Sequence, residues 1–99
     1  MKEKIGIVGA GLIGRAWAIV FARAGLTVAI HDAAPDALAA CQALLHENLG
    51  DLAHHHLLSE PVDTVLARIT PVANLGDALQ GAVLVQENVG ESVEAKRAI

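Results

Sequence analysis

The sequence is poor in cysteine, in aromatic residues and in basic charge. Cys41 is the single cysteine of the 99 residues, so a disulfide within the chain and a zinc site built from several cysteines are both excluded. Seven lysines and arginines against eleven acidic residues leave no basic stripe that could neutralise nucleic-acid phosphates. No apolar run approaches the ~20 residues that span a bilayer. These absences predict a single cytoplasmic domain with neither nucleic acid nor membrane among its partners.

What the sequence does contain is an alternation of short apolar runs with segments of helical periodicity. The runs show no polar alternation, which is typical of parallel strands covered on both faces. The strands predicted in this way are residues 5–8, 27–30, 69–72 and 82–86, and the predicted helices are 12–24, 35–52, 59–66, 75–79 and 92–99. This order predicts an α/β fold with a doubly wound parallel sheet and right-handed crossovers.

The first predicted helix carries one apolar stripe at spacings of three and four residues. The stripe consists of Ile13, Trp17, Val20, Phe21 and Ala24. We expect this stripe, including Trp17, to pack against the sheet, and Gly25 to end the helix. In the second helix Cys41 is expected to be a buried, unreactive thiol, and Gly50 can bend or end the helix early. Ser59 is the expected N-cap of the third helix.

A glycine-rich turn joins the first strand to the first helix. Gly9, Gly11 and Gly14 match the pattern G-x-G-x-x-G, which is weak evidence alone and gains weight from its place between a strand and a helix. Gly9 allows the sharp turn, Gly11 the approach of a pyrophosphate, and Gly14 close packing of helix on sheet. The alternative is an ordinary strand-to-helix connection. The pattern predicts a dinucleotide-binding fold of the Rossmann type, with about four strands in the order 3-2-1-4.

Asp32 follows the second strand, 18 positions after Gly14. A carboxylate at this place accepts hydrogen bonds from the adenosine ribose of NAD. A 2′-phosphate would meet like charge there, and none of the next three residues, Ala33, Ala34 and Pro35, is an arginine. NAD is therefore the predicted cofactor in preference to NADP.

Residues 86–96 carry a second informative pattern, with acidic residues at Glu87 and Glu91 and a lysine at Lys96. The pattern resembles the end of the fourth strand and the following turn in the 3-hydroxyacyl-CoA dehydrogenase family. The residues around Gly14 and Arg15 are most similar to its lambda-crystallin branch, also called the L-gulonate 3-dehydrogenase branch. The resemblance covers nearly the whole chain, but only the amino-terminal part of a family member.

The resemblance implies an enzyme that passes hydride from an L-3-hydroxyacyl-CoA or L-3-hydroxyacid substrate to NAD. It implies that Leu12 and Ile13 present their backbone to the pyrophosphate, and that Asp32 holds the ribose. Cofactor contacts towards the nicotinamide half are implied for Glu91 and Lys96, with Asn88 nearby; spacing alone would make Glu91 and Lys96 ordinary surface residues. Glu87 is a carboxylate within an apolar strand, where it needs a partner.

No catalytic residue is assigned within the chain. The family resemblance places the catalytic histidine and glutamate, and the substrate-orienting serine and asparagine, beyond Ile99. The chain's own histidines are poor candidates for the base, since His31 adjoins the ribose position and the others lie on or after the second helix. The run of three histidines at residues 54–56 fans out around a helix, so it predicts an exposed helix end and no metal site.

The chain stops at Ile99, soon after a predicted helix begins, where a doubly wound fold normally delivers more strands. We therefore expect residues 1–99 to be the amino-terminal part of an NAD-binding domain that binds NAD without turnover. The apolar edge of the fourth strand also predicts self-association into a homo-oligomer, or else marginal stability. Two alternatives stay open: a stand-alone NAD-sensing module that dimerises without catalysis, and a different NAD-dependent enzyme such as a hydroxyisobutyrate or sugar-nucleotide dehydrogenase.

Overall fold

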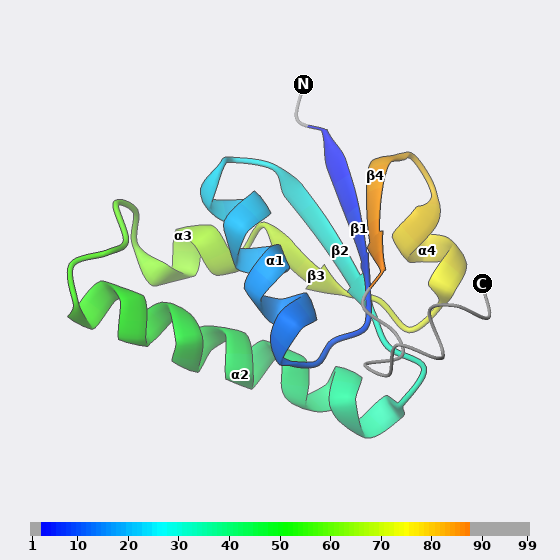
Figure 1. The fold of residues 1–99 in the computed structure, drawn as a ribbon, viewed down its shortest axis with the longest axis horizontal. Coiled ribbons are helices and arrows are strands. Elements are labelled where there is room, and N and C mark those ends of the chain that lie inside the picture. Colours follow the sequence, from blue (N-terminus) through cyan, green and yellow to red (C-terminus); the bar gives the residue numbers. More distant parts are fainter. Residues whose placement is uncertain (1–2, 88–99) are drawn as a thin grey trace.

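A computed structural model describes residues 3–87 as a four-stranded parallel sheet with helices on both faces (Figure 1). The strands are β1 (Lys4–Val8), β2 (Thr27–His31), β3 (Ile69–Pro71) and β4 (Ala82–Glu87). They lie in the order β3-β2-β1-β4, and each neighbouring pair is parallel. The order 3-2-1-4 predicted from the sequence is thus confirmed, together with all four strands.

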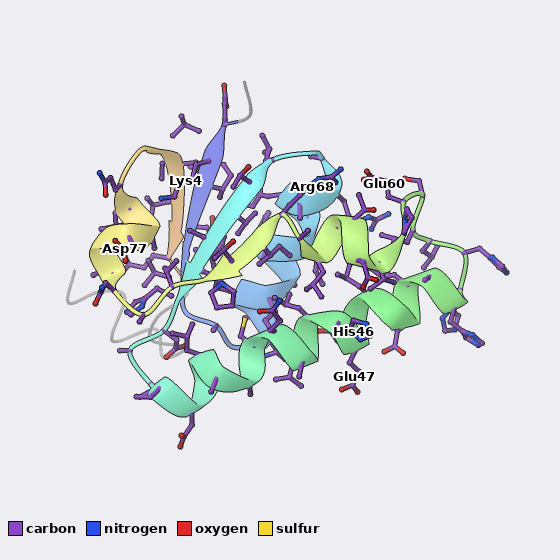
Figure 2. The ribbon with its side chains drawn as sticks, turned by 180° about the vertical axis from the view of Figure 1, so that it is seen from behind. Lys4, His46, Glu47, Glu60, Arg68 and Asp77 are labelled. Atoms are coloured by element: carbon purple, nitrogen blue, oxygen red, sulfur yellow. The ribbon has the colours of Figure 1, made fainter. Side chains whose placement is uncertain are left out.

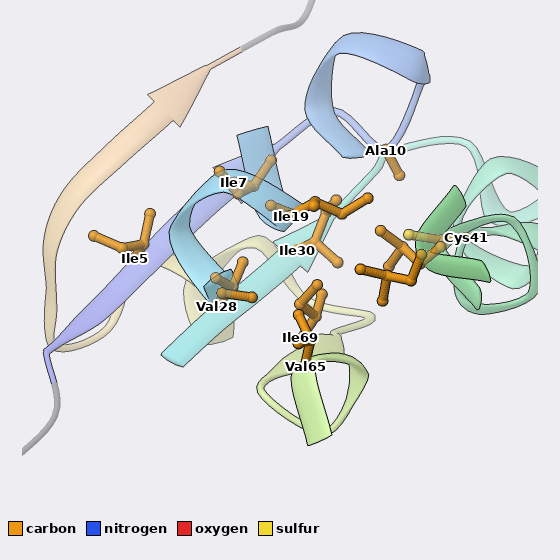
Figure 3. Close-up of a cluster of buried hydrophobic side chains, with 13 residues drawn as sticks. Ile5, Ile7, Ala10, Ile19, Val28, Ile30, Cys41, Val65 and Ile69 are labelled. Carbon is orange, nitrogen blue, oxygen red and sulfur yellow. The ribbon is translucent and has the colours of Figure 1, made fainter. Parts of the chain in front are cut away.

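The helices divide unequally between the two faces of the sheet. They are α1 (Leu12–Arg23), α2 (Pro35–His54), α3 (Val62–Leu66) and α4 (Leu75–Leu79). Figure 3 shows side chains of β1, β2 and β3 meeting those of α1, α2 and α3 in one hydrophobic cluster. The cluster includes Ile7, Ile30, Cys41 and Val65, all of them fully buried.

Helix α4 lies on the opposite face of β1 and approaches it very closely. A Cβ added to Gly6 would come within 2.5 Å of the carbonyl oxygen of Ala78 in α4, so only glycine fits at this position in β1. The Lys4 amine also links β1 to α4, because it donates hydrogen bonds to the carbonyl oxygens of Asp77 at 2.6 Å and Gln80 at 2.7 Å (Figure 2).

The structure corrects the predicted buried face of α1. Ile13, Trp17 and Val20 are exposed on the outer side of the helix, with 57%, 40% and 53% of their surfaces accessible. The buried positions of α1 are Gly14, Ala18, Ile19 and Ala22. The prediction that Trp17 packs against the sheet is therefore wrong; its ring instead stacks on Phe21, with ring centroids 5.8 Å apart.

The ends of the helices agree with the sequence at α1 and differ from it at α2 and α3. Gly25 follows α1 with a φ of +90°, the left-handed conformation expected of a glycine that ends a helix. Gly50 does not end α2 early, because the helix continues to His54. The expected N-cap at Ser59 is wrong, since α3 begins after Pro61, whose fixed φ suits a helix start without any side-chain cap.

An ion pair anchors the far end of α1. Arg68, just before β3, makes two hydrogen bonds to the Glu60 carboxylate, at 2.8 and 2.6 Å, and one at 2.8 Å to the carbonyl oxygen of Ala22 (Figure 2). The Glu60 carboxylate raises the pKa of Arg68, so this guanidinium keeps its charge. The contact holds the carboxyl end of α1 against the β3 side of the sheet.

Strand β4 is one of the two edge strands of the sheet, beside β1, and most of it is exposed. Val83, Leu84 and Val85 present apolar surface at this edge, whereas the central residues of β1 and β2 are buried. The predicted helix at residues 92–99 lies outside the described residues. No helix in the described part of the chain is long and apolar enough to cross a membrane.

Candidate functional site

The glycine turn lies at the carboxyl end of β1 and leads directly into α1. Gly9 has a φ of +103°, a conformation that favours glycine, which confirms its predicted part in the sharp turn. Its amide donates to the carbonyl oxygen of His31 at 2.7 Å and so joins the ends of β1 and β2. Gly14 is buried on the face of α1 that packs towards the sheet, as its predicted packing role requires.

The start of α1 is suited to bind an anion. The first helical hydrogen bond runs from the Arg15 amide to the carbonyl oxygen of Gly11, at 2.9 Å. The amides of Leu12, Ile13 and Gly14 precede it and have no partner within the helix. Gly11 is the N-cap without a side-chain hydrogen bond, and the first turn contains no acidic residue. These amides, with the helix dipole, favour a negatively charged group.

Asp32 binds the glycine turn directly. Its Oδ2 accepts a hydrogen bond from the Ala10 amide at 2.7 Å, and its Oδ1 accepts one from the Ala34 amide at 2.8 Å. Each carboxylate oxygen can accept a further bond, so Asp32 keeps the capacity to receive a hydroxyl. The sequence placed Asp32 beside the glycine turn; the hydrogen bond that links them is a finding of the structure.

A cation lies on the other side of Ala10, and the sequence alone had given it no role. Arg15 of α1 donates from Nη1 to the Ala10 carbonyl oxygen at 3.0 Å. Nearby Cys41 is buried, as predicted, and burial raises the pKa of its thiol; the charge of Arg15 lowers that pKa and the charge of Asp32 raises it. Arg15 immediately follows Gly14, the last residue of the glycine pattern, and its place next to the pattern is the signal in the sequence that could have identified it.

A cavity of about 320 Å³ opens beside Asp32, at the carboxyl ends of β1, β2 and β4. It is lined by Val8, Gly9, His31, Asp32, Ala33, Leu75, Leu79 and Glu87. Leu75 and Leu79 stand one helical turn apart on α4 and give the cavity an apolar wall. Sequence reasoning did not assign these two leucines to a site, although their spacing of four residues marks one face of a helix.

Of the remaining candidate residues, only Glu87 belongs to the part of the chain that the structure describes. Glu87 is the last residue of β4 and is exposed at the cavity, so it needs no buried partner as the sequence had suggested. Asn88, Glu91 and Lys96 lie outside the described residues. The arrangement within residues 3–87 therefore comprises the amides at the start of α1, a carboxylate at Asp32 and an apolar cavity that Gly9 and Asp32 both line.

One histidine adjoins the glycine turn, and the other four lie on or just after α2. His31 uses its Nδ1 in a contact of 3.0 Å with the carbonyl oxygen of Val72, at the β2–β3 side of the cavity. His46 is exposed on α2 (Figure 2), and the three at residues 54–56 are exposed where α2 ends. Within residues 3–87 no three histidine, cysteine or acidic side chains gather in a way that could hold a metal ion.

The comparisons with known proteins agree with this geometry. The family model described as 3-hydroxyacyl-CoA dehydrogenase, NAD binding domain, matches residues 4–99. Rabbit lambda-crystallin (Oryctolagus cuniculus) is 34% identical over 95 residues, which cover 94% of this chain and 30% of lambda-crystallin. The crystal structure of (S)-3-hydroxybutyryl-CoA dehydrogenase from Ralstonia eutropha matches with a TM-score of 0.82 at 30% identity, covering 97% of this chain and 34% of that one.

A further relative is the 3-hydroxybutyryl-CoA dehydrogenase of Bradyrhizobium diazoefficiens, 35% identical over 98 residues, which cover 98% of this chain and 33% of that enzyme. The chain thus spans about a third of the length of the relatives that it matches.

Proposed function

Because the chain belongs to the family of 3-hydroxyacyl-CoA dehydrogenase NAD-binding domains, we propose that it is the cofactor-binding part of an enzyme that oxidises an L-3-hydroxyacyl-CoA or an L-3-hydroxyacid. The match to lambda-crystallin confirms the resemblance noted in the sequence, and the family identifies the cofactor as NAD. The observation that carries the proposal is the hydrogen bond between Asp32 and Ala10, because it links the carboxylate proposed to hold the ribose to the turn proposed to hold the pyrophosphate.

The described residues offer one group each for the pyrophosphate, the adenosine ribose and the adenine of NAD. The amides of Leu12 and Ile13, with Gly9, Gly11 and Gly14 shaping the turn, would bind the pyrophosphate. Asp32 would accept the ribose hydroxyls, and the neighbouring apolar cavity would take the adenine. Asn88, Glu91 and Lys96 remain predicted contacts towards the nicotinamide half. The proposed NAD-binding domain spans residues 1–99, and its proposed location is the cytoplasm.

NAD, when bound, accepts the hydride that leaves the alcohol carbon of the substrate. The removal of the hydroxyl proton requires a base beside that carbon. The histidines of this chain are at the adenosine side, where His31 is, or along α2, so we assign none of them as the base. Residues 1–99 are therefore proposed to bind NAD without turnover. Clear NAD-linked turnover of acetoacetyl-CoA or L-gulonate by these 99 residues would overturn that part of the proposal.

The choice of NAD over NADP provides the first test. Calorimetric titration of the chain should give binding of NAD at least about tenfold tighter than that of NADP, a difference of about 1.4 kcal/mol. Asp32→Asn removes the negative charge that opposes a 2′-phosphate, so the ratio of the two affinities should fall towards one. Because Asp32 also holds the turn, its substitution should weaken the binding of both cofactors. The ratio of the NAD and NADP affinities therefore reports the effect of Asp32 at the ribose separately from its effect on the turn.

Asp36→Asn is the matched control for that experiment. Asp36 is an exposed acid in the first turn of α2, so its substitution changes the net charge equally without touching Asp32 or the turn. The control should leave the ratio of NAD to NADP affinity unchanged. Equal or tighter binding of NADP by the unaltered chain would contradict the role of Asp32.

A second candidate function is a stand-alone NAD-sensing module that dimerises. The exposed apolar residues of α1 and β4 favour this candidate, because exposed apolar side chains and an open strand edge are features of association sites. The same surface supports the homo-oligomer predicted from the sequence. Sedimentation with and without NAD separates the two candidates. A dimer that forms only with NAD supports the sensing module, whereas an association state independent of NAD supports the enzyme part.

A further inference from the structure

Ala10 is held by two charged side chains at once. Its amide donates to the Asp32 carboxylate at 2.7 Å, and its carbonyl oxygen accepts from Arg15 Nη1 at 3.0 Å. Both bonds involve an ionised partner, and such bonds are about twice as strong as those between neutral groups. Ala10 itself is 1% exposed and its side chain belongs to the hydrophobic cluster (Figure 3). We call this set of residues the Ala10 clamp.

The two halves of the clamp come from different elements. Arg15 projects from the first turn of α1 and Asp32 follows β2, so the clamp joins the start of α1 to the end of β2 through one residue of the glycine turn. Beside it, the Gly9 amide already bonds to His31. The backbone groups on the strand side of the turn are therefore engaged, while those at the start of α1 keep their donors for a ligand.

Arg15 is also unusual in its own bonding. Its Nε is buried and has no hydrogen-bond partner among residues 3–87. A buried donor without a partner costs about 1–3 kcal/mol, so this arginine is not explained by stability alone. Its position next to the phosphate-binding turn provides a reason to keep it there, since a fixed positive charge also favours a nearby diphosphate.

We propose that Arg15 is a positioning residue of the NAD site, which together with Asp32 fixes Ala10 so that the amides of Leu12 and Ile13 are aligned before the cofactor binds. The inference rests on the proposed placement of the pyrophosphate at the start of α1. Preorganised donors bind more tightly because ordering them on binding costs free energy. Loss of either half of the clamp should therefore weaken NAD binding, although Arg15 is absent from the usual glycine pattern.

The test compares Arg15→Met with the unaltered chain. Methionine keeps much of the apolar stem and loses every donor, so we expect NAD affinity to fall about tenfold, as measured by calorimetry. Amide hydrogen exchange followed by NMR separates an effect on the turn from a general loss of stability: the Ala10 amide should exchange about tenfold faster, with the amides of β2 unchanged. Arg15→Lys keeps a charge and a donor and should restore part of both quantities.

Arg23→Met is the matched control. Arg23 lies on the same helix and also donates to a backbone carbonyl, that of Leu57 at 2.6 Å, but at the end remote from the turn. It should leave NAD affinity and Ala10 exchange unchanged. If Arg15→Met unfolds the chain, Arg15→Lys carries the test, with partial losses in both quantities expected.

The possible outcomes separate this inference from the proposed function. Failure of the unaltered chain to bind NAD overturns the proposed function itself. Binding by the unaltered chain with undiminished affinity in the Arg15 variants overturns the inference alone. A loss of affinity with Ala10 exchange unchanged also overturns it, because Arg15 would then act through its charge and not through the clamp.

Discussion

The two sides of α1 use opposite kinds of apolar residue. The side that faces the sheet contains Gly14, Ala18 and Ala22, four residues apart in succession and all buried, with Ile19 as the one large residue that is buried beside them. The outer side carries the larger Ile13 and Val20, both more than half exposed. Small residues let the backbone of α1 lie close to the strands, and this closeness places the start of the helix at the glycine turn. For this helix, proximity to the sheet matters more than the apolar area that each residue buries.

This difference explains why the sequence predicted the wrong face. Helical periodicity identifies apolar stripes, and α1 has two of them, one of small and one of large residues. Burial of the large stripe is the usual expectation because it removes more apolar surface from water. Here the glycine pattern already contained the opposing signal, since Gly14 is a residue of close helix–sheet packing and belongs to the small stripe.

The largest expected effect comes from enlarging the small side. Ala18 is fully buried, so Ala18→Leu forces three additional carbons between α1 and the sheet. Such overpacking costs about 1–3 kcal/mol of unfolding free energy. Because it also pushes the start of α1 away from β1, NAD affinity should fall as well. Urea unfolding and calorimetry measure the two quantities.

Ala16→Leu serves as the control for Ala18→Leu. Ala16 is exposed on α1, so the same added carbons enter solvent and the groove beside α2. Its unfolding free energy should change by no more than about 0.5 kcal/mol. Equal destabilisation by the two leucines would show that the two sides of α1 do not differ as described.

Much of the fold was predictable because its signals are local. Apolar runs without alternation predicted the four strands, the repeated strand–helix order predicted a parallel sheet, and the glycine pattern predicted the sheet order 3-2-1-4. The edge position of β4 followed from that order. The end of α2 and the start of α3 were less predictable, since Gly50 is tolerated within a helix and Ser59 competes with Pro61 for the helix start.

In the candidate site, too, residues that belong to a local sequence pattern were predictable, and residues brought in by the path of the chain were not. Gly9 and Asp32 were identified from a pattern whose chemistry depends on neighbours in sequence, and the structure places them together. The wall of the cavity was not foreseen, because Leu75 and Leu79 reach it only through the path of the chain between β3 and β4. Arg15 was missed because its bond to Ala10 reaches back across the turn, and spacing alone does not reveal that contact.

The smallest effect is expected on the outer side of α1. Val20→Thr replaces a methyl group by a hydroxyl at a residue that is 53% exposed, so its unfolding free energy should change by less than about 0.5 kcal/mol. The same substitution at Val28, which is fully buried in β2, should cost about 1–3 kcal/mol because the hydroxyl is removed from water. A cost at Val20 similar to that at Val28, increasing with protein concentration, would mean that the outer stripe is covered in solution by a second copy. The difference in exposure between the two sides of α1 would then hold only for the monomer, because in the oligomer the large apolar residues would be buried against a second copy.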